Sequence, residues 1–313
     1  MIAAKLGIQL ILMIGIGYFV IKSHIVTEEF EKQLSSLIMK VLLPCLIIKS
    51  MMATFSWEDL RRCGQLAVLA VVIWTLTFGL AQLVHRLMGK TASARIMRFC
   101  MMYNNFTFVG IPVIEALYGD TGVLYFVVFL VPYRMVYYSS AEPLLSPPGT
   151  EHARRSMLEK LKGWFSAPVI AVFVGLTLYL TQIRLPSPIS GVISSLSSCA
   201  SPLGMLLCGM SLSKYPIPRL LRPQYLRFPL VRNFLLPGLI LALCLLTGLE
   251  QELTQIVTMF AALPAATLLA VFTIQFDSNE ETQFEAAAAV LITTVFSTVT
   301  VPMWAEILAR CYS

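Results

Sequence analysis

Charged side chains are scarce in this chain of 313 residues. Asp, Glu, Lys and Arg make up 13% of it, whereas about 25% is usual in a soluble domain. Hydrophobic residues make up 57%, and the mean hydropathy is +0.77. None of the polar connections is long enough to bury a core of its own. The composition therefore excludes a soluble enzyme and predicts a polytopic membrane protein without enzymatic activity.

Patterns that hold metals or cofactors are also missing. The seven cysteines are odd in number, irregularly spaced and without a Cys-x-x-Cys pair, and the three histidines have no partner at ligand spacing. We interpret the cysteines as small apolar side chains within helices. HExxH and GxSxG motifs are absent, as is a basic surface with interleaved aromatic residues. We therefore expect no metal, no cofactor and no nucleic-acid partner.

The sequence does contain ten apolar stretches near the length of about 20 residues that a helix needs to cross a bilayer. We interpret the first as a span rather than a signal peptide, because no strongly basic leader or clear cleavage site flanks it. The stretches are Leu6–Ile21, Leu34–Met52, Leu66–Val84, Phe99–Leu117, Val123–Tyr138, Ala167–Leu180, Ile193–Leu212, Leu230–Leu246, Ile256–Ile274 and Ala286–Ala305. The predicted fold class is an all-α integral membrane protein in contact with lipid.

Basic residues predict the orientation. Counted from the connection after the first stretch, the odd connections carry fourteen of the 23 lysines and arginines, and the opposite side carries five. Because basic residues favour the cytoplasmic side, the odd connections are predicted to be cytoplasmic and both termini extracellular or periplasmic. The predicted location is the cell membrane.

The longest connection lies near the middle of the chain. We expect a first five-helix repeat at 1–140, a cytoplasmic central loop at 141–163 and a second five-helix repeat at 164–313. Since five is odd, the second repeat enters the membrane in the opposite orientation, which predicts an inverted repeat.

The fourth stretch of each half contains proline near its middle. Phe99–Leu117 is expected to break at Gly110-Ile111-Pro112, and Ile256–Ile274 at Pro264-Ala265-Ala266-Thr267. Proline lacks a backbone donor, and broken helices at matching places in two halves point to the binding site of a transporter. We expect half-helices to begin at Pro112 and Pro264, where two positive helix ends form an anion site. The alternative is that both prolines only shape packing.

Polar side chains near the first break are candidate ligands. Asn104 and Asn105 are expected either to bond substrate or to join helices. Gly110 permits close backbone approach or unusual dihedral angles. Glu115 is a candidate for proton coupling, for capping the new half-helix, or for an interfacial position.

Basic residues inside the apolar stretches have either a functional or a structural role. Arg134 and Lys49 are the basic residues most expected to lie within the membrane for a functional reason, and snorkelling to an interface is the alternative for both. For Arg232 a structural role is favoured.

Six short motifs, in this order, resemble the auxin efflux carrier family, which includes plant PIN-type carriers and bacterial malate and malonate permeases. The resemblance covers nearly the whole chain. The motifs are Val41-Leu-Leu-Pro44, Asn105-x-x-Phe-x-Gly-Ile-Pro112 with Glu115-Ala-Leu-Tyr-Gly119, Ser201-Pro-Leu-Gly to Ser213, Arg232-Asn-Phe-Leu-Leu-Pro237, Ala261-Ala-Leu-Pro-Ala-Ala-Thr267 and Ser297-Thr-Val-Thr-Val-Pro302.

The resemblance implies a fold like that of bile-acid/sodium symporters and sodium–proton antiporters. Stretches 1, 2, 6 and 7 would form a scaffold, and stretches 3–5 and 8–10 a transport domain that moves like an elevator. Stretches 4 and 9 would cross at their breaks and bind substrate against stretch 2. The resemblance also implies a homodimer joined through the scaffolds.

The resemblance assigns Asn105 to substrate contact and Pro112 and Pro264 to the crossing. Many bacterial members have a polar residue four positions after the second proline, where this chain has Leu268, which leaves room for Thr267 to substitute or for a more apolar ligand. The full set of candidate substrate-binding residues is Pro44, Asn104, Asn105, Thr107, Gly110, Pro112, Arg134, Pro264, Ala265 and Thr267.

We therefore predict a secondary transporter of small organic anions, mainly carboxylates, that works by alternating access. Its driving force is open between proton symport through Glu115 and the membrane potential. A sodium- or proton-coupled antiporter of the same fold is the alternative, although the paired aspartates typical of such antiporters are missing. A membrane sensor that binds a ligand without moving it is the alternative of another class.

Overall fold

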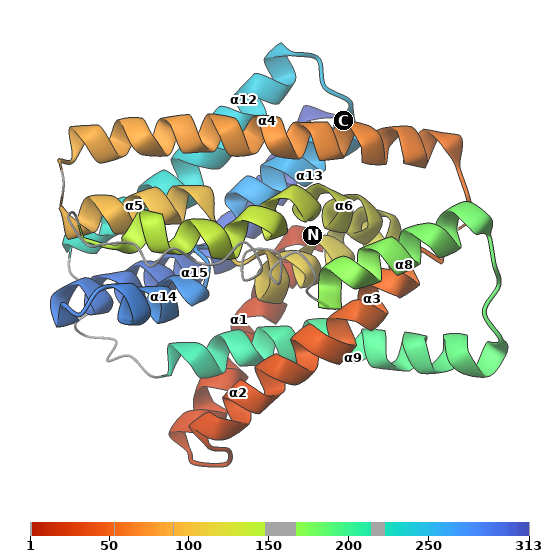
Figure 1. The fold of residues 1–313 in the computed structure, drawn as a ribbon, viewed down its shortest axis with the longest axis horizontal. Coiled ribbons are helices and arrows are strands. Elements are labelled where there is room, and N and C mark those ends of the chain that lie inside the picture. The colour runs from red at the N-terminus through yellow and green to blue at the C-terminus, as the bar shows by residue number, and fades with distance from the viewer. Residues whose placement is uncertain (1, 53, 90, 148–166, 214–222, 313) are drawn as a thin grey trace.

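The computed structural model describes residues 2–52, 54–89, 91–147, 167–213 and 223–312 (Figure 1). Within these ranges the chain is helical and contains no strand, and its β pairing is one isolated bridge between Asn104 and Ala265. The predicted central loop at 141–163 lies outside the described residues from residue 148 onward.

Each of the ten predicted stretches falls mainly on helix. The first half contains α1 (Ile2–Lys22), α2 (Glu28–Leu37), η1 (Ile38–Leu42), α3 (Leu43–Ser50), α4 (Trp57–Leu87), α5 (Ala92–Met102), η2 (Phe106–Gly110) and α6 (Ile111–Leu145). The second half contains α8 (Ala167–Thr181), α9 (Ser187–Leu212), η3 (Pro223–Leu226), α11 (Arg227–Pro229), η4 (Leu230–Leu235), α12 (Leu236–Leu246), α13 (Gln251–Ala262), α14 (Leu268–Phe276) and α15 (Glu280–Cys311).

Six of the described helical segments are long and apolar enough to cross a membrane by length and composition. They are Glu29–Ser50, Trp57–Leu87, Phe106–Tyr137, Ser187–Leu207, Pro223–Leu246 and Glu280–Cys311. Leu12–Lys22 and Ala167–Thr181 are shorter apolar helices. The structure is thus that of an all-helical, multi-pass membrane protein.

Helix α6 differs from the prediction at two places. It includes both the end of the fourth predicted stretch and all of the fifth, joined at a kink where Gly119 has a φ of 64°. It also continues to Leu145, beyond the start predicted for the central loop. Two arginines of α5 explain the extension, because Arg98 donates to the carbonyl of Leu144 (2.6 Å) and Arg95 to that of Leu145 (3.0 Å).

The helices pack in two groups that also contact each other. In the first group, α9 contacts α1 and α3, and α3 contacts α8. In the second, α4 contacts α5 and α6, α12 contacts α13, and α15 contacts α13 and α14, while α1 of the first group also contacts α15. In Figure 1, α3 and α9 lie on one side and the long α4 on the opposite side. A Cβ at Gly17 of α1 would lie 2.0 Å from the carbonyl oxygen of Leu206, and a Cβ at Gly209 of α9 would lie 2.0 Å from that of Ile14. Glycine on both helices therefore permits a backbone contact that no side chain would allow.

Three prolines follow π-helical turns. Pro44 follows η1, Pro112 follows η2 and Pro237 follows η4, each as the second residue of the next α-helix. Proline cannot donate to the carbonyl four residues earlier, and a π-turn bonds residues five apart. These prolines therefore lie inside continuous helical segments.

Candidate functional site

The break in the first of the two proline-containing segments lies at residues 103–105, upstream of the predicted position. Helix α5 ends at Met102, and Tyr103 is extended, with a φ of −127° and a ψ of 136°. Helical structure resumes at Phe106, because the side chain of Asn105 caps the new start by accepting a hydrogen bond from the amide of Phe108 (3.1 Å). The predictions that the chain breaks at Gly110-Ile111-Pro112 and that a half-helix begins at Pro112 are therefore wrong.

The second break lies where it was predicted, but its helix starts later. Helix α13 ends at Ala262, Leu263 is extended, and α14 begins at Leu268. The prediction that Pro264 begins the half-helix is therefore wrong, because Pro264 belongs to the non-helical segment.

The two breaks bond each other. The amide of Asn105 donates to the carbonyl of Pro264 (2.9 Å), and the amide of Ala266 donates to the carbonyl of Tyr103 (3.4 Å). The amide of Ala265 donates to the hydroxyl of Thr293 on α15 (3.1 Å). Backbone groups released by the breaks are thus satisfied within the protein, as a membrane interior requires.

Gly110 lies where the segment after the first break meets the second break. A Cβ at this position would lie 2.6 Å from Cδ1 of Leu263 and 3.1 Å from the ring of Phe126. Of the two roles predicted for Gly110, the structure shows close approach.

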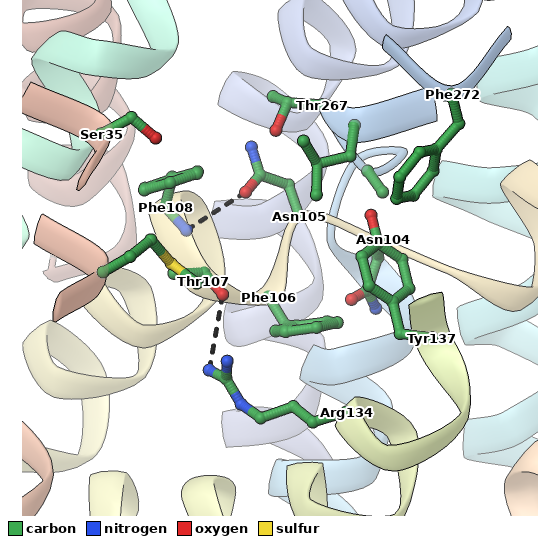
Figure 2. Close-up of a pocket in the computed structure, with 13 residues that line it drawn as sticks. Ser35, Asn104, Asn105, Phe106, Thr107, Phe108, Arg134, Tyr137, Thr267 and Phe272 are labelled. Atoms are coloured by element: carbon green, nitrogen blue, oxygen red, sulfur yellow. Dashed lines mark hydrogen bonds between the residues drawn. The ribbon is translucent and has the colours of Figure 1, made fainter. Parts of the chain in front are cut away.

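A cavity of about 280 Å³ lies beside the paired breaks (Figure 2). Its wall includes Phe106 and Leu268, which begin the helical segments η2 and α14 after the two breaks, together with side chains from α2, η1 and α6. The lining residues are Ser35, Met39, Asn104, Asn105, Phe106, Thr107, Phe108, Arg134, Tyr137, Ala266, Thr267, Leu268 and Phe272. Five of the predicted site residues, namely Asn104, Asn105, Thr107, Arg134 and Thr267, thus lie around one space.

Arg134 supplies the positive charge of this cavity. Its side chain is buried, with 6% exposed, and its guanidinium donates to the hydroxyl of Thr107 (3.4 Å). The guanidinium carbon also lies 4.9 Å from the ring centroid of Phe106, a cation–π contact. None of the described residues that line the cavity is acidic. Arg134 therefore faces the cavity and not a membrane interface.

Polar groups of the breaks add hydrogen-bonding capacity. Figure 2 shows the amide of Asn105 between Phe108 and Thr267, with its oxygen toward Phe108 and its nitrogen toward Thr267. The amide nitrogen of Asn104 donates to the carbonyl of Phe260 (2.5 Å), while its buried Oδ1 atom has no hydrogen-bond partner among the described residues. An acceptor of this kind requires a water molecule or a donor on a ligand.

Aromatic side chains make up much of the apolar part of the cavity wall. The ring of Tyr137 lies 5.7 Å from that of Phe106 and 5.8 Å from that of Phe272, measured between centroids. Leu268 and Met39 add apolar surface. The described lining thus combines the positive charge of Arg134 with a largely apolar wall.

The remaining predicted residues lie outside this lining. Pro44, Gly110, Pro112, Pro264 and Ala265 shape the helices and breaks around it. Glu115 accepts a hydrogen bond from Ser201 of α9, and Lys49 pairs with Asp120 at 3.4 Å. Among the described residues, no group of three His, Cys, Asp or Glu side chains is arranged to hold a metal ion.

Several lining residues were missed, although helical spacing indicates some of them. Tyr137 follows Arg134 by three positions and Phe272 follows Leu268 by four, so each shares a helix face with a residue already singled out. Ser35 and Met39 also share a face, but nothing in the sequence shows which helix that face meets.

Comparison with known proteins shows the family of this chain. Residues 3–305 match a family described as membrane transport proteins. The chain belongs to this family. The match confirms the resemblance to auxin efflux carriers and makes the chain a membrane transporter.

Two of the three relatives described below are named as transporters. An uncharacterized transporter of Methanothermobacter thermautotrophicus is 24% identical over 317 aligned positions, which cover 96% of this chain and 97% of the relative. Two proteins of Saccharomyces cerevisiae match shorter regions. The uncharacterized transporter YLR152C is 29% identical over 75 residues and Protein ECM3 is 27% identical over 77, covering 24% and 25% of this chain and 13% of each relative.

Proposed function

We propose that this transporter carries small organic anions, mainly carboxylates, and binds them in the cavity beside the paired breaks. The observation that carries the proposal is the buried guanidinium of Arg134, which faces the cavity beside Thr107 and Phe106. A carboxylate accepts two parallel hydrogen bonds from a guanidinium, so Arg134 suits the binding of a carboxylate substrate.

The helix starts support the same charge preference. Phe106 and Leu268 begin the helical segments after the two breaks, and both line the cavity. The start of a helix carries a partial positive charge and free backbone donors. Thr107 and Thr267 add hydroxyl groups at the same places.

The wall favours a monocarboxylate with an apolar body over a dicarboxylate. Arg134 is the one basic residue among the thirteen described residues that line the cavity, and four of the thirteen are aromatic. Leu268 lies at the position where many bacterial relatives were expected to have a polar group. A second carboxylate would lose its hydration without gaining a charged partner.

We propose the ten-span inverted repeat as the architecture, with residues 1–140 and 164–313 as the repeats and 141–163 as the cytoplasmic loop. Among the helices of the expected scaffold, α9 contacts α1 and α3, and α3 contacts α8. The cavity lies between the breaks and residues of α2 and η1. This placement supports movement of the breaks relative to the scaffold, as in an elevator.

Placement in the cell membrane with both termini outside, and pairing into a homodimer, are also proposals. They rest on the distribution of basic residues and on the family. The driving force stays open. The hydrogen bond between Glu115 and Ser201 joins α6 to α9, so a proton on Glu115 would act at a contact between the two helix groups.

Uptake into proteoliposomes tests the proposal. The purified protein is offered radiolabelled mono- and dicarboxylates with aliphatic or aromatic bodies, while pH, sodium and potential gradients are imposed separately. We expect saturable uptake of an apolar monocarboxylate. Hydrogen bonds to a charged group contribute about 1.5–3 kcal/mol, so Arg134→Gln should weaken apparent affinity about 10- to 100-fold.

Asn105→Ala should also reduce uptake, because it removes the cap of the segment that begins at Phe106. Arg310→Gln is the matched control, since that arginine is 78% exposed and does not line the cavity. Unchanged saturable uptake in both cavity variants would rule out this cavity as the substrate site. Ligand-induced stabilisation without flux under any gradient would favour the sensor, and flux that requires counter-transport of sodium or protons would favour the antiporter.

A further inference from the structure

Arg232 is buried at the centre of the protein and does not line the cavity. Its side chain is 2% exposed and extends from the π-turn η4. Its three nitrogens donate to three backbone carbonyls: Nε to Leu263 (2.9 Å), Nη1 to Met101 (3.1 Å) and Nη2 to Phe260 (3.4 Å).

These carbonyls belong to the ends of the two helices that stop at the breaks. Met101 is the next-to-last residue of α5, Phe260 lies in the last turn of α13, and Leu263 directly follows α13. The last carbonyls of a helix lack intrahelical donors. One guanidinium therefore joins two helix ends that are far apart in sequence.

The charges balance as well. Each helix end carries a partial charge of about −0.5, so two ends together offset the charge of one arginine. No carboxylate of the described residues pairs with Arg232. The helix ends thus take the place that an acidic side chain would occupy in an ordinary buried ion pair.

The bonds of Arg232 lie next to those that shape the cavity. The carbonyl of Phe260 also accepts from the side-chain amide of Asn104, which lines the cavity. Leu263 precedes Pro264, whose carbonyl accepts from the amide of Asn105. Loss of the hydrogen bonds of Arg232 would therefore displace the carbonyl that Asn104 bonds and the residue next to the carbonyl that Asn105 bonds.

We propose that Arg232 is a positioning residue that holds the two breaks in register and thereby sets the affinity of the cavity without touching the substrate. The register part of this inference is independent of the transported compound, whereas the affinity part rests on the proposed function. Lysine cannot replace it fully, because a single ammonium does not present donors in the fixed fork that reaches three separated carbonyls.

Disulfide cross-linking tests the register directly. Asn104 and Ala265 face each other without bonding to each other, since the bridge is closed by their neighbours. Such a pair has Cα atoms about 4.5 Å apart, within the range that a disulfide spans. In a background lacking the seven native cysteines, Asn104→Cys with Ala265→Cys should cross-link rapidly when a mild oxidant is added.

We expect Arg232→Met to slow this cross-linking at least tenfold and Arg232→Lys to slow it less. Arg95→Lys is the matched control, because Arg95 is also buried and also bonds a helix-end carbonyl, but that of Leu145, away from the breaks. Elution as a single species in detergent establishes that each variant is folded. If Arg232→Met does not fold, the cross-linking rate of Arg232→Lys is compared with that of the parent instead.

Transport supplies the second readout, without the engineered cysteines. Arg232→Lys should raise the KM for the transported acid at least fivefold more than it lowers the maximal rate per folded molecule, because the cavity is distorted while the helices persist. Equal cross-linking rates in the parent and in both Arg232 variants would overturn the proposal, as would an unchanged KM. Slower cross-linking in a protein that transports no carboxylate would support the role of Arg232 in holding the breaks in register and reject the proposed function.

Discussion

A methyl group added at Gly110 should disturb the paired breaks more than its size suggests. The new Cβ of Gly110→Ala would lie 2.6 Å from Cδ1 of Leu263 and 3.1 Å from the ring of Phe126. Carbon atoms in contact are normally about 3.5–4.0 Å apart, so Leu263 would have to move by roughly 1 Å. Both neighbours are fully buried and have no solvent to move into.

The expected cost follows from overpacking. Extra methyl groups in a packed interior cost about 1–3 kcal/mol. A change of 1 kcal/mol shifts the unfolding temperature of a chain of 150–250 residues by about 2–4 °C, and longer chains lie at the low end. At about 2 °C per kcal/mol, a fall of about 2–6 °C is expected. Since Leu263 precedes Pro264, whose carbonyl accepts from Asn105, uptake should fall further than stability alone would explain.

The assay is thermal unfolding of the purified protein in detergent, followed by uptake of folded protein. Gly79→Ala on α4 is the control, because no atom lies within 4 Å of the added Cβ, and alanine favours a helix over glycine by up to about 1 kcal/mol. Leu263→Ala provides a second check. Combined with Gly110→Ala it should cost less than the sum of the two single changes, because the new methyl occupies vacated space. Equal stability of Gly110→Ala and Gly79→Ala would refute the reasoning.

Three further predictions concern charge and selectivity. Hydrogen bonding from Arg62 lowers the pKa of Glu250 below its ordinary value of 4.5. The Glu250 carboxylate therefore stabilises the fold above pH 4.5, and this contribution is lost as the pH falls through the pKa of the folded state. Glu250→Gln should flatten the acid side of a curve of unfolding free energy against pH. Asp277→Asn removes the charged partner of buried Arg95 and should cost about 3–5 kcal/mol, whereas replacing both residues of the pair with apolar ones should recover most of the unfolding temperature. Leu268→Asn should shift competition between dicarboxylates and apolar monocarboxylates about tenfold, or 1.4 kcal/mol, toward the dicarboxylates, and an unchanged inhibition ratio would count against Leu268 as a selectivity residue.

Composition and motif order were enough to predict a helical membrane transporter of this family, because both depend on residues near one another in the sequence. The number of spans, the repeats and the direction of the termini stay predictions. The polar side of the cavity was partly predictable for the same reason. Asn104 and Asn105 are polar amides in an apolar stretch, and Arg134 is a cation in another, so each stands out where it is.

The positions of the breaks could not be read in the same way. At the first break the helix ends because Tyr103 and Asn105 bond Ala266 and Pro264, about 160 residues away in the sequence. Arg232 was given a structural role, but its partners are backbone carbonyls, which leave no trace in residue identity. Contacts of this kind exist only once the fold brings the two segments together.

Proline misled the prediction at Pro112 for a physical reason that also applies elsewhere. Pro44, Pro112 and Pro237 each follow a π-turn, where the missing donor is absorbed without ending the helix, whereas Pro264 lies in a true break. Each π-turn contains a residue that lines the cavity or bonds the breaks beside it. Met39 of η1 and Thr107 of η2 line the cavity, and Arg232 of η4 bonds the helix ends at the breaks. An extra residue in a turn rotates the side chains before it by about 100° relative to those after it, since a helix has 3.6 residues per turn. A proline in the middle of a span therefore indicates either a break or a change in the direction that nearby side chains face. In this protein the break at Pro264 and the three π-turns all lie next to the same cavity or to the breaks that border it.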